Sequence, residues 1–299
     1  MRGAWAVVAA AVLWGTAGAA GMLALGADST VAPVSLAAAR LVIGGLVLAL
    51  ATGPFLASAV NARPRGALVL AALAVAGYQL AYFAAVDRTG VAVGTMVSLG
   101  SGPVFTGALA WLIDRKRPAL RWAAATALAV AGCAVLVLGG ARGGGQVEVS
   151  GVLLALLGGF LYAFYTVTAA RVIAAGAPSG AVMGVMFGCA AVVMLPILLW
   201  SGVGWLTTPG GLLVALYLGC VTTALSYILY GVGLRTTPVA TAVTLTLAEP
   251  AVASLLGVAV LGERLSPVST AGLALLAAGL IMVALPTRTA DRQAAQSSS

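Results

Sequence analysis

Long runs of apolar residues, separated by short polar segments, dominate this sequence. Ten runs reach the roughly 20 residues that a helix needs to cross about 30 Å of hydrocarbon. The polar separators are rich in Gly, Pro, Arg and Asp. The runs cover approximately residues 4–25, 34–52, 66–86, 91–112, 120–138, 150–173, 179–201, 210–233, 239–260 and 267–285. This pattern predicts an all-α membrane protein with ten transmembrane helices.

Composition supports this interpretation and narrows the chemistry. Of the 299 residues, 62% are hydrophobic and only 7% are charged, whereas a soluble domain carries about 25% charged residues. The sequence has no histidine, and its three cysteines lie inside apolar runs without metal-ligand spacing. No glycine-rich phosphate loop precedes Lys116, the single lysine. We therefore expect no metal site, no cofactor and no catalytic residues.

Basic residues are distributed unevenly between the two ends of the predicted helices. With a cytoplasmic N-terminus, eleven of them lie inside, three (Arg88, Arg142 and Arg264) lie outside, and Arg40 lies within a span. Cytoplasmic loops carry an excess of positive residues. We expect a multi-pass protein of the cytoplasmic (inner) membrane with both termini in the cytoplasm, and a disordered tail over residues 287–299. Because the basic residues are scattered over short loops, nucleic acid is not an expected partner.

The sequence also contains an internal repeat at a shift of 147 residues. Five spans per half is an odd number, so the second half must be inverted relative to the first. Inverted repeats are typical of secondary transporters, with the binding site near the midplane between the halves. We expect repeats at residues 1–140 and 150–286. The matching pairs are Arg88-Thr89 with Arg235-Thr236, Pro103 with Pro250, Arg117 with Arg264 and Ala131-Gly132 with Ala278-Gly279, while a shift of 148 aligns Gly3 with Gly151 and Trp14 with Tyr162.

Several motifs resemble those of the drug/metabolite transporter superfamily, in particular its EamA branch. They are Leu13-Trp14-Gly15, Arg40, Glu249-Pro250 and the segment Leu261-Gly262-Glu263-Arg264-Leu265. The resemblance covers about residues 4–286 and implies a ten-helix transporter that exports amino acids, other metabolites or toxic compounds. The first half departs from the pattern, because Gly102 stands where Glu249 stands in the second half. The two halves are therefore not expected to be functionally equivalent.

Glu249 is the first candidate for a functional group. A charge inside an apolar span costs about 2.5–3.5 kcal/mol, and Pro250 frees the carbonyl of Thr246, four residues back. One interpretation is a proton-titratable or cation-binding group beside a broken helix. The other is a buried glutamate that is hydrogen-bonded to a neighbouring helix. Because Pro103 and Pro250 are repeat equivalents, we predict helix breaks at both, although a proline inside a transmembrane helix can also form a mere kink.

Arg40 is the second candidate, about six residues into the second span. Its guanidinium could hold a substrate carboxylate. Alternatively it extends to the membrane surface or pairs with Asp28, Asp87 or Glu249. Further predicted cavity residues are polar or aromatic, because polar tips avoid lipid. They are Trp14, Tyr78, Gln79, Tyr82, Ser98, Tyr162, Tyr165, Tyr227 and Thr244.

The remaining spans yield two structural predictions. The second, fifth, seventh and tenth spans are almost wholly apolar, and we interpret them as outer scaffolding. Gly180, Gly184 and Gly188 form a small-residue face on the seventh span, which fits close packing within the chain better than a homodimer interface.

Together these observations favour secondary transport by alternating access. We expect the chain to move a small metabolite, amino acid or drug-like solute across the membrane, and the resemblance favours export. The expected partners are that solute and the lipid bilayer. One alternative is a membrane-embedded lipid-modifying enzyme, which would need clustered ionisable groups near one interface. Another is a sensor or assembly subunit that transports nothing.

Overall fold

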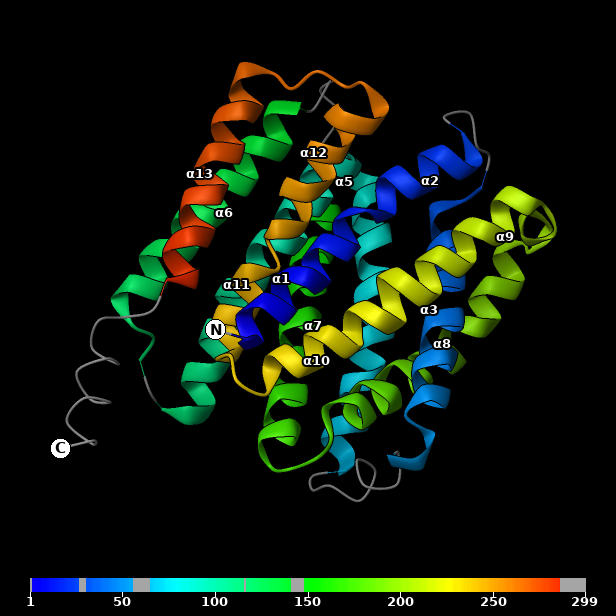
Figure 1. Ribbon diagram of the computed structural model, residues 1–299, viewed down its shortest axis with the longest axis horizontal. Helices are drawn as coiled ribbons and strands as arrows, with labels where there is room; N and C mark the ends of the chain where they lie inside the picture. The colour runs from blue at the N-terminus through cyan, green and yellow to red at the C-terminus, as the bar shows by residue number, and fades with distance from the viewer. Residues whose placement is uncertain (1, 27–30, 56–64, 116, 141–147, 286–299) are drawn as a thin grey trace.

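The computed structural model describes residues 2–26, 31–55, 65–115, 117–140 and 148–285, and these form helices joined by short loops (Figure 1). No strand occurs among them, so the predicted all-α fold is confirmed. The elements are α1 (Arg2–Gly15), α2 (Ala17–Leu25), α3 (Pro33–Ala51), α5 (Arg65–Asp114), α6 (Leu120–Gly140), α7 (Val149–Ala174), α8 (Ser179–Ser201), the 3-10 turn η1 (Gly204–Thr207), α9 (Pro209–Leu216), the π-helical η2 (Tyr217–Leu225), α10 (Ser226–Leu234), α11 (Val239–Leu245), α12 (Ala248–Leu261) and α13 (Pro267–Ala284).

Within these residues, nine helical stretches are long and apolar enough to cross a membrane. The longest, Gly66–Asp114, has 49 residues and turns back at Gly90, where φ is 77° and ψ is 160°. Glycine tolerates a positive φ because it has no Cβ. The bend divides this stretch into the predicted third and fourth spans, which gives two sets of five. The predicted tail over residues 287–299 lies outside the described residues.

The ninth span is interrupted between α11 and α12. Pro250 cannot donate to the carbonyl of Thr246, and that carbonyl instead accepts a bond of 3.0 Å from the Glu249 amide. The eighth span is continued by the π-helical segment η2, which the sequence did not predict. By contrast, α5 stays helical through Pro103. The predicted break at Pro103 is therefore wrong, because one missing donor need not interrupt a helix that its neighbours support.

The fifth and tenth spans, α6 and α13, pack side by side at one edge of the molecule (Figure 1). A Cβ added to Gly132 would collide with the backbone nitrogen of Leu276, and one added to Gly279 would collide with the backbone of Ala129. Under the 147-residue shift, Gly279 is the equivalent of Gly132, and Leu276 is the equivalent of Ala129. The two contacts are thus reciprocal, which relates the two halves by a pseudo-two-fold axis between these helices.

The second and seventh spans, α3 and α8, are each 50% buried within the protein, compared with 33% for α6 and 22% for α13. Each contributes many buried residues, including Leu41, Leu48, Met183 and Phe187. Interpreting them as outer scaffolding is therefore wrong, because an apolar helix can face either lipid or protein. The small-residue face of α8 packs within the chain, since a Cβ on Gly188 would lie 3.0 Å from the Cβ of Ala49 in α3.

Candidate functional site

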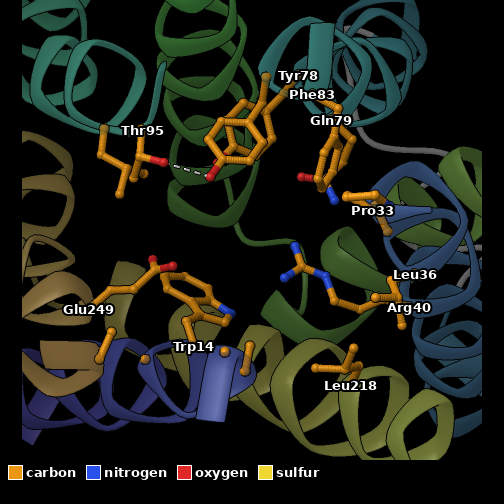
Figure 2. Close-up of a pocket in the computed structure, with 17 residues that line it drawn as sticks. Trp14, Pro33, Leu36, Arg40, Tyr78, Gln79, Phe83, Thr95, Leu218 and Glu249 are labelled. Atoms are coloured by element: carbon orange, nitrogen blue, oxygen red, sulfur yellow. Dashed lines mark hydrogen bonds between the residues drawn. The ribbon is translucent and has the colours of Figure 1, made fainter. Parts of the chain in front are cut away.

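A cavity of about 350 Å³ lies between α1, α2, α3, α5, η2 and α12. The residues from α3 belong to its first turns, from Pro33 to Arg40 (Figure 2), and this end of α3 lies beside the end of α2 (Figure 1). The cavity therefore occupies the half of the molecule away from the N-terminus. Its lining consists of Trp14, Gly15, Ala17, Gly18, Pro33, Leu36, Ala37, Arg40, Tyr78, Gln79, Tyr82, Phe83, Thr95, Leu99, Leu218, Glu249 and Ala253.

Arg40 and Glu249 are the two charged residues of this lining. Figure 2 shows the guanidinium and the carboxylate pointing into the same space from α3 and α12. Both residues are described by the structure, yet no ion pair joins them. The Nε atom of Arg40 is buried and has no hydrogen-bond partner. Of the other predicted partners of Arg40, Asp87 is exposed and Asp28 lies outside the described residues.

Polar and aromatic groups complete the lining. Gln79 is only 4% exposed and faces the cavity with Tyr78 (Figure 2). The Tyr82 hydroxyl and the Thr95 hydroxyl lie 2.8 Å apart. Trp14 is 7% exposed, and its indole Nε1 is buried without a partner. The cavity thus combines an apolar wall with a few convergent polar groups, as small-molecule sites do.

A buried aromatic cluster adjoins the cavity through Trp14. The Trp14 ring lies 5.0 Å from that of Tyr227 and 5.4 Å from that of Tyr230. Tyr162 contacts Thr246 at 3.1 Å and Tyr230 at 3.4 Å between hydroxyl oxygens. These contacts join α1, α7, α10 and the break after α11 into one closely packed block.

The predicted site residues therefore divide into two groups. The first group lines the cavity: Trp14, Arg40, Tyr78, Gln79, Tyr82 and Glu249. The second group is buried outside the lining: Ser98, Tyr162, Tyr165, Tyr227 and Thr244. Tyr165 and Tyr227 face each other at 3.2 Å between hydroxyls, and Thr244 faces Thr126 at 3.0 Å. Neither Pro103 nor Pro250 lines the cavity, although Pro250 adjoins Glu249.

Sequence reasoning missed the apolar part of the lining, notably Leu36, Phe83 and Leu218. These side chains carry no polar signal, and on α3 only Arg40 was expected to reach the interior. Proline at the start of a helix, as at Pro33, could have marked where α3 enters the site.

The repeat relates the cavity to the aromatic cluster. Trp14, Phe83 and Leu99 line the cavity. Their repeat equivalents are Tyr162, Tyr230 and Thr246, whose hydroxyls contact one another in the cluster. One of two equivalent spaces is therefore open, and the other is filled by side chains.

Comparisons with known proteins agree with this architecture. The model of the EamA-like transporter family matches residues 1–138 and again residues 149–285. An "Uncharacterized transporter YwfM" of Bacillus subtilis (strain 168) is 39% identical over 224 residues, which cover 75% of this chain and 74% of that protein. A solved structure titled only "Crystal structure of protein" superposes with a TM-score of 0.79 at 22% identity, covers 94% of this chain and 96% of its own, and supports the fold alone. The chain is thus a multi-pass membrane transporter built of two repeats, and it belongs to the EamA-like transporter family.

Proposed function

We propose that this chain is a secondary transporter that carries a small zwitterionic solute by alternating access, and that the cavity is its binding site. The observation that carries the proposal is the opposition of Arg40 and Glu249 across one cavity without an ion pair between them. Trp14, Tyr78, Gln79 and Tyr82 would form the rest of the site.

The charges favour a solute that carries both signs. Ionised groups at membrane depth are costly unless they are paired or hydrated. A solute with a carboxylate and an ammonium group would pair with Arg40 and Glu249 together. A guanidinium suits a carboxylate because it can donate two parallel hydrogen bonds. An amino acid or a similar metabolite has this chemistry, and the apolar wall would accommodate its side chain.

The two repeat-equivalent spaces support alternating access. In this conformation the cavity is open, and the space around Tyr162, Tyr230 and Thr246 is filled. Transport would require the opposite arrangement as well, reached when the repeats rock against each other. The repeats would act as units of residues 1–140 and 150–286.

The distribution of basic residues supports an orientation with cytoplasmic termini in the inner membrane. The cavity lies in the half away from the N-terminus, so this conformation would be open to the outside. For export, the solute would bind from the cytoplasm when the space around Tyr162, Tyr230 and Thr246 is open. It would then leave to the outside from the cavity.

Proteoliposomes loaded with a panel of amino acids, nucleosides, sugars and cationic drugs test the proposal through counterflow of labelled solute. We expect counterflow with a zwitterionic solute, and loss of at least tenfold in its rate for Arg40→Gln and for Glu249→Gln. Glu263→Gln and Arg88→Gln, which change exposed residues away from the cavity, serve as matched controls. Full activity and unchanged thermal stability in the Glu249→Gln variant would show that Glu249 is not part of the binding site.

The same panel separates the alternatives. A sensor or assembly subunit would show no counterflow with any solute. Imposed pH gradients then report coupling, because a proton-coupled carrier accelerates in one direction of the gradient and Glu249→Gln would abolish that response.

A further inference from the structure

A second cavity, of about 570 Å³, lies between the second half of α5 and α6, away from the candidate solute site. Its lining is almost wholly apolar. On α6 it consists largely of alanines, which leave space against α5, and α6 packs tightly on its other side against α13. The lining includes Met96, Val104, Trp111, Trp122, Ala127 and Ala131.

This groove opens toward the bilayer. Val104 and Trp111 in its wall are 58% and 44% exposed, and they belong to a helix that crosses the membrane. A long apolar groove along a helix pair in contact with hydrocarbon suits an acyl chain.

Positive charge lies at one end of the groove. Trp111 and Pro118 line that end, and Arg115 and Arg117 are exposed in the turn between them. Among the described residues neither arginine forms an ion pair. The acidic group of the turn, Asp114, is already paired with Arg171 at 2.9 Å.

This arrangement matches an anionic phospholipid. Its phosphodiester would meet Arg115 and Arg117, its glycerol region would lie at Trp111, and one acyl chain would fill the groove. Tryptophan is enriched at the level of the lipid headgroups, and basic clusters at the cytoplasmic ends of transmembrane helices bind anionic headgroups. We propose that the groove between α5 and α6 is a binding site for an anionic glycerophospholipid.

The site adjoins a part of the protein that transport would move. Thr126 at the groove is 4% exposed, and its hydroxyl lies 3.0 Å from that of Thr244 on α11. A bound chain would therefore lie one side chain away from the broken ninth span.

Native mass spectrometry of the full-length protein tests the proposal by titration with phosphatidylglycerol and with phosphatidylcholine of the same acyl chains. We expect phosphatidylglycerol to bind more tightly, and the Arg115→Gln/Arg117→Gln variant to lose this preference. The expected weakening is about fivefold per arginine, the equivalent of about 1 kcal/mol for a basic residue at a membrane surface. The charge-matched control is Arg88→Gln/Arg264→Gln, whose residues lie on the opposite membrane face, and it should leave the affinity unchanged.

The groove is tested separately with Ala127→Phe, which fills it, against Ala124→Phe, which adds the same ring to an exposed position of α6 outside the lining. Ala127→Phe should weaken the binding of both lipids at least fivefold, whereas Ala124→Phe should leave their binding unchanged. Ala131→Phe repeats the test if Ala127→Phe does not fold.

Each of three results from these titrations would overturn the proposal. They are equal affinity for the two lipids, equal loss in the arginine variant and its control, or unchanged binding after the groove is filled. Millimolar inorganic phosphate that displaces phosphatidylglycerol would also overturn it, by indicating an anion site without a lipid.

Discussion

The closing role of the filled space around Tyr162, Tyr230 and Thr246 can be tested by removing a single hydroxyl group. Tyr162→Phe removes the group that contacts Thr246 and Tyr230 and leaves the ring in place. If the cluster holds one side of the transporter closed, this variant should raise the population of the conformation in which that side is open.

The magnitude follows from the contacts. The Tyr162–Thr246 distance is 3.1 Å and the Tyr162–Tyr230 distance is 3.4 Å, so the first is the stronger interaction. The Thr246 hydroxyl also donates to the Val243 carbonyl at 2.7 Å, so it keeps a partner in the variant. A buried hydrogen bond whose partner remains satisfied contributes about 0.5–1.5 kcal/mol. The Tyr230 hydroxyl also loses its contact with Tyr162, so we expect a shift of at least about 1 kcal/mol, or about fivefold or more in population.

Two reporter cysteines measure this shift. Thr95 lines the cavity, and its repeat equivalent Ala242 is completely buried. Each is replaced by cysteine after Cys189 and Cys220, which are not buried, are changed to serine. Tyr162→Phe should raise the rate of maleimide alkylation at position 242 about fivefold or more, and should change the rate at position 95 little, because the present conformation still dominates.

Tyr217→Phe is the matched control. Its hydroxyl contacts that of Thr16 at 2.8 Å, outside the cluster, so its loss should not expose position 242. An unchanged alkylation rate at position 242 in Tyr162→Phe would refute the closing role of the cluster. Equal increases at positions 95 and 242 would indicate general loosening, and would refute it as well.

Three further variants test packing and charge by thermal unfolding in detergent. Gly132→Ala should destabilise by about 1–3 kcal/mol because its Cβ would collide with backbone, whereas Gly21→Ala, with nothing within 4 Å of its Cβ, should be neutral or stabilising; equal effects would contradict the close approach of α6 and α13. Ser266→Ala should cost about 1 kcal/mol, since this side chain caps α13 through the Ser269 amide; an unchanged midpoint would contradict the cap. Arg171→Gln should cost less than about 1 kcal/mol and nothing in high salt, because its ion pair is exposed; a larger loss would mean that the pair is a structural support.

Hydropathy sufficed to predict the spans, because a bilayer crossing requires a long apolar run whatever the helix contacts. The same fact explains the errors at α3 and α8. Lipid tails and protein interior are equally apolar, so composition could not say that Phe187 of α8 packs on Tyr227 with ring centroids 3.9 Å apart.

The two charged residues of the site could be predicted from the sequence. Arg40 and Glu249 are costly at membrane depth, so they require a cavity or a partner. A buried tyrosine or threonine hydroxyl needs neither a cavity nor a charged partner, because it can form a hydrogen bond with another hydroxyl. Tyr165 and Thr244 do so, and no sequence signal separates them from Tyr82, which faces the cavity.

The asymmetry between Gly102 and Glu249 acquires a physical reason from these contacts. A Cβ at Gly102 would lie 3.0 Å from the Tyr162 ring, so the glycine provides the space in which that ring closes the filled side. Glu249 at the equivalent position borders the open cavity instead. A carboxylate at position 102 would have to displace Tyr162, whereas a glycine at position 249 would remove the charge opposite Arg40. The residue that differs between the repeats therefore distinguishes the side of the molecule that is closed by packing from the side that would hold the solute.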